Sequence, residues 1–340
     1  EAHLMSDEGL NILGGTFPGG VSIFHGVNEY LGWAHTVNHA DFSDVYRLTI
    51  NPKNKKQYHL DGEWLDLKKR KYKAKLKLGF LKIPISKKIY ESKFGVTFKT
   101  KNGTFAWRYS ANTDIRAAEQ WYRMNKAKSF EEFRELLNWR AIVSNNIVYA
   151  DREDNIYYLS NGRIPVRNPN YDWGGVLPGD TSATFWNEFL PINHLPQVLN
   201  PESGYVWNTN NTPFSSSDRT GNPKETELNK TMGYQSTGVE NNRSMRFMEL
   251  IEQYDKLSYE DFKNVKYDEQ FPEELTRPRI VNLELIMDLD ASKYPNISDA
   301  IEHLNQVEQD VKAIGNFELI DHFRKLSYID NIYYMDNNNS

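Results

Sequence analysis

The spacing of hydrophobic residues changes along this chain, and that change limits the possible folds more than any other feature. In the first half, short runs such as residues 30–37 are rich in apolar and β-branched residues and are bounded by Gly, Asn and Pro, which is typical of strands. From Glu240 onward the apolar residues recur at helical spacing, which predicts helices over 241–257, 258–267 and 296–314. Strands followed by helices predict an α+β fold rather than a regularly alternating α/β sheet.

Two local patterns in the strand-rich half predict individual elements. Ser129 and Glu132 have the spacing of a capping box in front of an apolar stripe, which predicts a helix over 129–139. The dipeptide Asp61-Gly62 lies between two strand-like runs and predicts a type I′ hairpin turn. Both patterns depend on a few neighbouring residues, so they can be recognised without knowing the rest of the fold.

A lysine-rich stretch over residues 68–78 has two interpretations. As a basic run it resembles a nucleic-acid patch, but short basic motifs are weak evidence for such binding. Over residues 71–78 lysine alternates strictly with Tyr, Ala and Leu. This alternation favours a strand with one half-buried apolar face and one solvated face.

The composition excludes several classes of protein. A chain of 340 residues with 39% hydrophobic and 13% aromatic residues can bury a substantial core, and its net charge of −5 gives no basic footprint for nucleic acid. It has no cysteine, which excludes disulfides, zinc–thiolate sites and a cysteine nucleophile. No apolar run reaches the length of a membrane span. Because the first residue is Glu1 and not Met, the sequence is expected to be a mature product or a fragment of a longer protein.

Residues 31–48 concentrate polar side chains between apolar ones, and three interpretations compete: a metal site, part of an active site, or a polar turn. His35 and His39 would share a face only on a helix, whereas the pattern here predicts a strand, so a zinc site is disfavoured. Asp41 and Asp44, with the Ser43 carbonyl between them, suit a hard cation such as calcium. A turn capped by Asp41 is the alternative.

Residues 207–213, with the sequence WNTNNTP, form a second polar cluster that carries amides but no charge. Asn side chains donate hydrogen bonds without changing protonation state, which suits an oxyanion hole. Asn is also common in turns for conformational reasons, and that alternative stays open. The sequence contains no nucleophile elbow, P-loop, dinucleotide fingerprint or HExxH motif, so the residues alone identify no nucleophile.

Several stretches together resemble the β-subunit of the penicillin acylase family, a group of N-terminal-nucleophile hydrolases. The central one is NEYLGWAHTVNHADFSDVYRL followed by YHLDGEW. Five further stretches match in the same order as in the family: EAHLMSDEGLNILGGTFPGGVSIFHG, RAAEQWYRMNKAKSFEEF, NNIVYADREDNIYYLSNGRIPVR, NPESGYVWNTNNTPF and NNRSMRFMELI. The resemblance covers a core over 1–252 and leaves a helical segment over 253–340 that matches poorly.

This resemblance implies a four-layer αββα sandwich, present here in part. The family's nucleophile is a serine at the very N-terminus of the β-subunit, and its own α-amine, with an ordinary pKa of about 7.7–8.0, acts as the general base. That serine and the α-subunit are absent from this sequence, so no internal serine is assigned the role. Family members are typically exported, which implies a periplasmic or extracellular location.

The resemblance also assigns roles to residues that bind or stabilise the substrate. The Val37 backbone N–H and the Asn210 side-chain amide match the two halves of the oxyanion hole, and Arg243 matches an arginine that organises the site. His25 and His35 match positions that wall the acyl pocket, with core histidines as the alternative. Phe24 is a further candidate contact, with core packing as its alternative.

A structural calcium ion is the cofactor that the resemblance implies. Its predicted ligands are the Asp41 and Asp44 carboxylates, the Ser43 carbonyl, Asp218 and the Pro178 carbonyl. One ligand from the α-subunit would be missing from this chain.

The predicted function is hydrolysis of a linear acyl amide by the full protein, with penicillins, acylated homoserine lactones and lipopeptide side chains as possible substrates. The chain alone is expected to be inactive. The alternative is a calcium-stabilised binding or scaffold protein of the same fold. A metal-dependent hydrolase using His35, His39 and Asp41 is a third, weaker hypothesis. The expected partners are a small acyl amide and an α-subunit from the same precursor, and no nucleic acid or membrane span.

Overall fold

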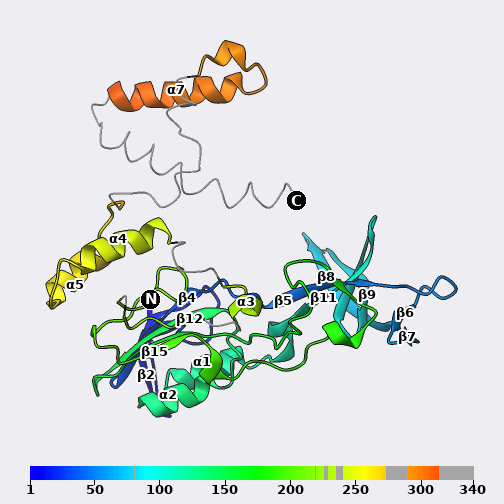
Figure 1. Ribbon diagram of the computed structural model, residues 1–340, viewed down its shortest axis with the longest axis horizontal. Coiled ribbons are helices and arrows are strands. Elements are labelled where there is room, and N and C mark those ends of the chain that lie inside the picture. The colour runs from blue at the N-terminus through cyan, green and yellow to red at the C-terminus, as the bar shows by residue number, and fades with distance from the viewer. Residues whose placement is uncertain (80, 219, 226–228, 235–239, 273–288, 314–340) are drawn as a thin grey trace. The chain divides into compact units, whose positions relative to one another are not determined.

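The computed structural model describes residues 1–313 apart from 80, 219, 226–228, 235–239 and 273–288 (Figure 1). The chain divides into two compact units, Glu1–Glu240 and Asn241–Ser340. Within the described residues, every strand belongs to the first unit. This separation of strands from the C-terminal helices confirms the predicted α+β class. The predicted boundary between a family-like core over 1–252 and a helical segment over 253–340 differs from the boundary between these two units. The predicted division stays a prediction.

The first unit is built around a seven-stranded antiparallel sheet with the order β1-β2-β3-β4-β12-β13-β15. Its strands are β1 (Ala2–Ser6), β2 (Leu10–Gly15), β3 (His25–Val27), β4 (Leu31–Val37), β12 (Asn145–Asp151), β13 (Ile156–Ser160) and β15 (Gln197–Leu199). The pairing of β4 with β12 joins segments more than a hundred residues apart in sequence, with Val37 opposite Asn145.

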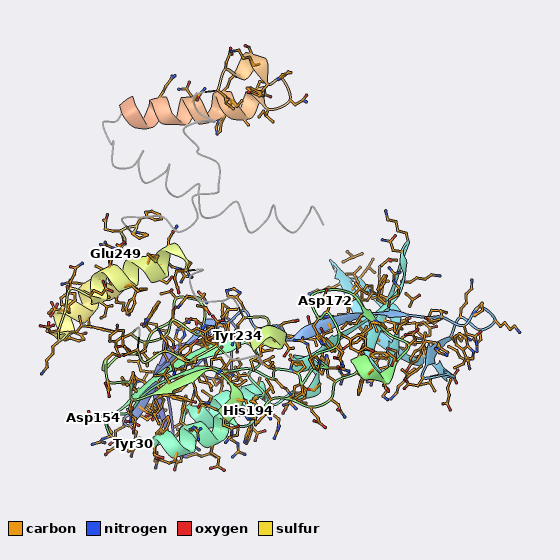
Figure 2. All side chains as sticks on the ribbon, in the orientation of Figure 1. Tyr30, Asp154, Asp172, His194, Tyr234 and Glu249 are labelled. Carbon is orange, nitrogen blue, oxygen red and sulfur yellow. The ribbon has the colours of Figure 1, made fainter. Side chains whose placement is uncertain are left out.

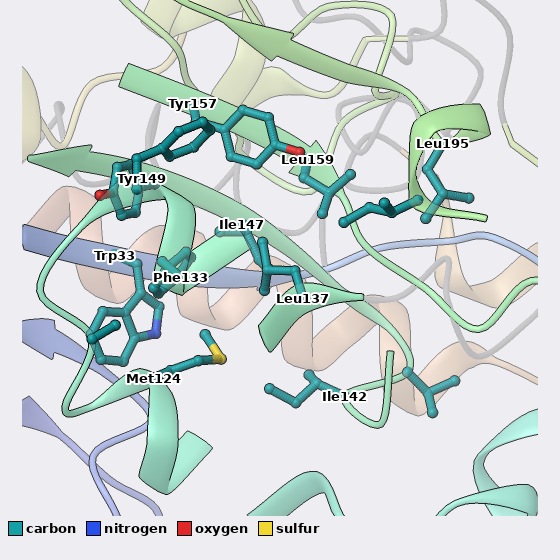
Figure 3. Packing of buried hydrophobic residues seen from close by; sticks show 14 of the residues in the cluster. Trp33, Met124, Phe133, Leu137, Ile142, Ile147, Tyr149, Tyr157, Leu159 and Leu195 are labelled. Carbon is teal, nitrogen blue, oxygen red and sulfur yellow. The ribbon is translucent and has the colours of Figure 1, made fainter. Parts of the chain in front are cut away.

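One face of this sheet packs against two helices, α1 (Ala117–Met124) and α2 (Phe130–Leu137). Alternate residues of β4 supply the core, because Leu31, Trp33 and His35 are buried while Ala34 between them is exposed. Figure 3 shows Trp33 beside Phe133 of α2, and their ring centroids lie 5.5 Å apart. The helix predicted over 129–139 is therefore confirmed, and its Ser129 cap accepts the Glu132 N–H at 3.2 Å.

A second sheet has six strands in the order β14-β5-β11-β10-β9-β8. They are β5 (Ser43–Leu48), β8 (Lys68–Leu78), β9 (Leu81–Ser92), β10 (Gly95–Thr100), β11 (Gly103–Tyr109) and β14 (Leu177–Pro178). Its own small core includes Tyr46, Phe94, Ala106 and Leu177. A separate hairpin joins β6 (Gln57–Leu60) to β7 (Glu63–Asp66), and its turn residues Asp61 and Gly62 both have positive φ, as the type I′ prediction requires.

The lysine-rich stretch forms strand β8, as its alternation predicts, but its burial was predicted wrongly. Every residue of β8 is exposed, including Tyr72, Leu76 and Leu78 on the apolar side. The alternation correctly identifies a strand, yet burial requires another element to pack on the apolar face. No described residue supplies that cover.

Short helices complete the first unit, and helices make up the described part of the second. In the first unit they are α3 (Asn229–Met232) and the 3-10 helices η1 (Ser110–Thr113), η2 (Ser182–Thr184) and η3 (Ile192–His194). The second unit contains α4 (Asn242–Ile251), α5 (Tyr259–Lys266), η4 (Ala291–Lys293) and α7 (Ser298–Ala313), which confirms the three predicted helices. Among the described residues, no helix is both long enough and apolar enough to cross a lipid bilayer.

Candidate active site

The ends of β4 and β12 carry a hydrogen-bonded group of polar side chains. Thr36 and Asn146 are register partners across the two strands. Thr36 Oγ1 donates to Asn208 Oδ1 at 2.5 Å, and Asn146 Nδ2 donates to the same oxygen at 3.1 Å. Tyr158 on β13 donates its hydroxyl to Asn146 Oδ1 at 3.0 Å. The asparagine-rich stretch over 207–213 is therefore anchored directly to the sheet.

The backbone of Val37 is oriented away from β12. The next residue, Asn38, donates its N–H to the Ser144 carbonyl at 3.1 Å. Because antiparallel pairs alternate between hydrogen-bonded and non-hydrogen-bonded, Val37 opposite Asn145 belongs to the second kind, so its N–H and C=O point outward. Strand β3 pairs with β4 only as far as Trp33. The Val37 N–H therefore points to the β3 edge of β4, at a position that β3 does not pair with.

Asn210 reaches this same strand end from the loop after β15. Its φ of 62° is left-handed, a conformation that Asn tolerates better than most residues. The Asn208 side chain fixes the turn by accepting the Asn210 N–H at 2.9 Å. Asn210 Nδ2 then donates to the Val37 carbonyl oxygen at 2.8 Å, a contact between residues 173 apart in sequence. The structure thus brings together the two residues predicted to form the oxyanion hole.

The chemistry of this pair follows from its donors. A side-chain amide is a neutral donor, and that of Asn210 already lies against the Val37 backbone. The Val37 backbone N–H is a second neutral donor at the same place. Two such donors, fixed by a sheet and a braced loop, suit an oxygen that gains negative charge during acyl transfer.

A small cavity is lined in part by the residues that follow Val37 and Asn210 in sequence. It is lined by Asn38, His39, Asn211, Thr212, Pro213 and Tyr234. Tyr234, labelled in Figure 2, accepts a hydrogen bond at its hydroxyl from Ser160 Oγ of β13 at 3.0 Å. The cavity wall is therefore connected to the same sheet that carries Val37. His39 lies here and not beside His35, so the described structure gives the zinc hypothesis no paired ligands.

His35 is a buried histidine with both ring nitrogens engaged. Its Nε2 accepts the Trp121 indole N–H at 3.0 Å, so its Nδ1 carries the proton and donates to the Asn146 carbonyl at 3.2 Å. Burial lowers the pKa of His35 to about 4, partly offset by the bond to Asn146. His35 is thus a neutral, fixed part of the strand. Its contacts are those of a buried histidine whose hydrogen bonds are satisfied. A role of His35 in the wall of the acyl pocket stays a prediction.

Phe24 lies at the centre of an aromatic group that reaches the surface. Its ring centroid is 4.4 Å from Phe17, 4.9 Å from His35, 5.0 Å from Trp121 and 5.5 Å from His25. Phe17 and His25 are exposed, whereas Trp121 comes from α1. The three predicted pocket residues Phe24, His25 and His35 are therefore grouped, on the same face of β4 that carries the Val37 side chain.

The predicted calcium carboxylates are joined by an arginine. The Arg167 side chain is fully buried, and its Nη2 lies 3.1 Å from both Asp41 Oδ2 and Asp44 Oδ2. Arg167 Nη1 donates to the Thr231 carbonyl at 2.7 Å, and the Trp186 indole donates to Asp44 Oδ2 at 2.6 Å. Burial raises the pKa of Asp44, and the charge of Arg167 counteracts part of that increase.

The predicted ligand set does not fit a calcium ion as a whole. Calcium takes six to eight oxygen ligands, but the Pro178 carbonyl accepts the Thr184 hydroxyl at 2.7 Å and Pro178 pairs with Arg47. Asp218 is engaged within its own turn by Thr220 and Gly221. Asp44 Oδ1 is buried without a hydrogen bond among the described residues, so one acceptor remains there. The charge that calcium would supply between Asp41 and Asp44 is supplied by Arg167.

Arg243 belongs to the second unit, near the start of α4, and is exposed. Partial desolvation by the surrounding chain lowers its pKa below the ordinary value for arginine. Because it lies in a different compact unit from Asn210, its predicted role in organising the site stays a prediction.

Sequence reasoning missed Trp121, Asn146, Arg167 and Trp186. Arg167 contacts an aspartate 123 residues away, and Trp121 contacts a histidine 86 residues away. Nothing in the neighbouring sequence distinguishes these residues from ordinary surface or core positions. Asn146 had a weak signal, because it is a polar residue at a buried position of a predicted strand.

Comparison with known proteins agrees with this geometry. A sequence profile of the family described as penicillin amidase matches residues 1–313, which continues past residue 252. The acyl-homoserine lactone acylase PvdQ of Pseudomonas fluorescens (strain Pf0-1) is 27% identical over 63% of this chain and 31% of its own length. Penicillin G acylase of Escherichia coli is 26% identical over 60% of this chain and 24% of its own length.

A solved structure shows that the fold is shared as well. The thermostable penicillin G acylase from Alcaligenes faecalis superposes with a TM-score of 0.64 at 20% identity, over 88% of this chain and 52% of that one. The chain thus spans less than a third of the length of the two curated relatives. The profile match, the shared fold and the joined Val37–Asn210 pair lead to one conclusion: this chain belongs to the penicillin amidase family.

Proposed function

We propose that this chain supplies the oxyanion hole of an enzyme that hydrolyses a linear acyl amide. The observation that carries the proposal is the contact of Asn210 Nδ2 with the Val37 carbonyl at 2.8 Å. This contact places two neutral donors at one strand end. In the reaction, the Val37 N–H and the Asn210 side-chain amide would donate to the oxygen of the tetrahedral intermediate.

The nucleophile in this proposal is an N-terminal serine that lies on polypeptide outside the chain. The relatives support this, because the chain spans only 31% and 24% of their lengths. That serine oxygen attacks the acyl carbon, and the α-amine takes the hydroxyl proton. The α-amine then gives this proton to the leaving nitrogen as the C–N bond breaks, so the amine product departs and an acyl-enzyme ester remains. Water then releases the acyl group from the serine. The chain's own residues bind and orient the acyl carbonyl in both steps.

The substrate in this proposal is a small acyl amide whose acyl group contacts the aromatic group around Phe24. Phe17, half-buried Phe24 and His25 present a largely apolar surface on the side of β4 toward which the Val37 side chain points. Penicillins, acylated homoserine lactones and lipopeptide side chains all carry an acyl group that would contact this surface. A second subunit from the same precursor and a periplasmic or extracellular location also belong to the proposal. Cell fractionation with mass spectrometry of the purified protein tests these two points.

The mature protein purified from its own source provides the first test. Intact mass and N-terminal sequencing should find a chain that begins with serine and contains residues 1–340, together with a smaller copurifying chain. Turnover is then measured on a series of chromogenic N-acyl amides. A mature protein that lacks this serine and turns over none of them would favour the non-catalytic scaffold of the same fold.

Substitution of Asn210 tests the oxyanion hole itself. Asn210→Asp keeps the shape and the tolerance of left-handed φ but removes the N–H donors, and Asn210→Ala removes the side chain. Each should lower kcat by about two to three orders of magnitude, as for other lost oxyanion donors.

The matched control is Asn102→Ala, an exposed asparagine in the turn between β10 and β11, which should keep the parent kcat. Unchanged kcat in both Asn210 variants, with thermal unfolding like that of the parent, would remove Asn210 from the site.

A further inference from the structure

Strands β8 and β9 form a long two-stranded hairpin, residues 68–92, here named the lysine hairpin. The strands pair without interruption from Lys68 opposite Glu91 to Leu78 opposite Leu81. In Figure 1 it lies at the end of the first unit opposite to β2 and α2. All described residues from Lys68 to Lys88 are exposed, so nothing described covers either face of the ribbon.

Toward its tip, one face of the lysine hairpin is apolar, whereas nearer the base the same face carries Lys68, Arg70, Lys87 and Glu91. This face continues onto the neighbouring strands. The register aligns Glu91 with Val96 of β10, and Val96 with Trp107 of β11, so these residues share one face of the sheet. The exposed hydrophobic residues on this face, named the apolar face, are Tyr72, Leu76, Leu78, Leu81, Ile83, Ile85, Val96, Phe98 and Trp107. Each is between 38% and 54% exposed. An exposed apolar surface of this extent marks a binding surface.

The opposite face of the same hairpin carries a row of lysines. They are Lys69, Lys71, Lys73, Lys75, Lys77, Lys82 and Lys88. Lys71 lies directly opposite Lys88, and Lys77 opposite Lys82, an arrangement that opposes strand pairing. The only acidic residue of the hairpin is Glu91, and it is already paired with Arg70 at 2.8 Å. A positive row of this kind within a chain of net charge −5 favours an anionic partner.

An occupant that covers the whole hairpin has to satisfy both faces. An acidic protein surface would match the lysines but leave the apolar face in water, and an apolar protein groove would do the reverse. A bilayer with anionic headgroups presents hydrocarbon next to a layer of negative charge. A two-stranded ribbon is about 5 Å from strand to strand, so lysine side chains on one face can reach the headgroups at its edges.

We propose that the lysine hairpin binds the surface of an anionic lipid bilayer, with its apolar face in the interfacial layer and its lysines at the headgroups. The apolar residues at the tip, Leu78 and Leu81, lie next to the Lys77–Lys82 pair, so insertion and charge contact occur together. This surface role goes beyond acyl-amide hydrolysis. It is measured without turnover and stands or fails independently of the proposed function.

Vesicle binding tests the charge requirement. The full-length mature protein is mixed with vesicles of phosphatidylcholine alone, or of phosphatidylcholine and phosphatidylglycerol in a ratio of about 3:1, and bound protein is measured by flotation. Binding should require phosphatidylglycerol and should weaken with salt. The double variant Lys73→Glu/Lys75→Glu should bind about tenfold or more weakly.

The control Lys53→Glu/Lys55→Glu changes the net charge equally, on exposed residues outside the hairpin, and should keep the parent affinity. Equal binding of both double variants, equal binding to the neutral vesicles, or no binding to either vesicle overturns the proposal.

The absence of native cysteine allows a direct test of the apolar face. Leu76→Cys and the control Val21→Cys, on an 80% exposed residue outside the hairpin, are labelled with an environment-sensitive fluorophore. Anionic vesicles should shift the emission of the label at position 76 to shorter wavelength and leave the label at position 21 unchanged. If a copurifying subunit protects the thiol of the Leu76→Cys variant from labelling while that of the Val21→Cys variant reacts, the face is a protein interface and the proposal is wrong.

Discussion

His35 and Arg167 are two buried ionisable residues that are stabilised in opposite ways. His35 is kept neutral by burial, with Trp121 and Asn146 satisfying its two nitrogens. Arg167 stays charged and shares its Nη2 between Asp41 and Asp44. Because both side chains are buried, the loss of one hydrogen-bonding partner should destabilise the fold.

The neutrality of His35 predicts a dependence of stability on pH. Its pKa falls from 6.5 in the unfolded chain to about 4 in the folded protein. The unfolded state therefore binds the proton more readily, and this contribution to stability is intact above pH 6.5 and is lost as the pH falls toward 4. At pH 5 the loss should reach about 2 kcal/mol, measured by urea unfolding at pH 8 and pH 5.

Replacement of the histidine removes the titrating group. His35→Gln should reduce the loss of unfolding free energy between pH 8 and pH 5 by about 2 kcal/mol, whatever its stability at pH 8. The control His194→Gln changes an exposed histidine, labelled in Figure 2, and should keep the parent's pH dependence. If His35→Gln has the same slope as the parent, His35 does not control it.

Arg167 predicts a strong coupling to Asp44. Arg167→Met leaves a buried carboxylate without its counter-charge and should lower the free energy of unfolding by about 3 kcal/mol or more. Asp44→Asn in the same chain removes the unpaired charge and should restore a large part of that loss, which a double-mutant cycle in urea measures. Additive effects of the two substitutions would contradict direct coupling.

The same ion pair predicts how the protein responds to chelation. Since Arg167 supplies the positive charge between the two carboxylates, EDTA should leave the Tm of the parent unchanged, and added calcium should not raise it. A rise of several degrees with calcium alone would show that Asp44 Oδ1 accepts a metal ion in spite of the arginine.

At the scale of secondary-structure elements, the features that depend on neighbouring residues could be predicted from sequence. The cap of α2 at Ser129 and the Asp61-Gly62 turn are both present. The burial of β8 could not be predicted, because alternation shows which residues share a face but not what packs on it. Of the calcium ligands that the resemblance implies, Pro178 and Asp218 accept hydrogen bonds from Thr184 and Thr220 in the structure, contacts that the sequence does not reveal.

The β6–β7 turn offers a test at the same scale. Gly62 has a φ of +93° and open space where a Cβ would lie, so Gly62→Ala introduces backbone strain without a clash. It should lower the free energy of unfolding by about 1 kcal/mol, measured in urea. Gly175→Ala is the matched control, because its Cβ would meet only an ordinary contact at 3.9 Å and its φ is not left-handed. Equal effects of the two substitutions would exclude strain as the cause.

At the scale of the whole molecule, family membership could be recognised from sequence because several short motifs occur in the right order. The contacts that build the site could not, since Val37 and Asn210 are 173 residues apart and only the fold joins them. The resemblance assigned both residues to one site, and the structure brings them into contact, while their role as an oxyanion hole stays a prediction. The partners Asn146, Asn208 and Trp121, which fix that site, became visible only when β4, β12 and α1 were seen together.

The long separation between Val37 and Asn210 also has a consequence for the order of events during synthesis. Closing so large a loop is entropically unfavourable, and the sheet that closes it needs β12 before the second edge of β4 is paired. A ribosome that delivers the chain from its N-terminus releases β4 long before it releases Asn210. The donors at the strand end therefore come together only after more than half of the chain has left the ribosome, and any chemistry that depends on them starts after that moment.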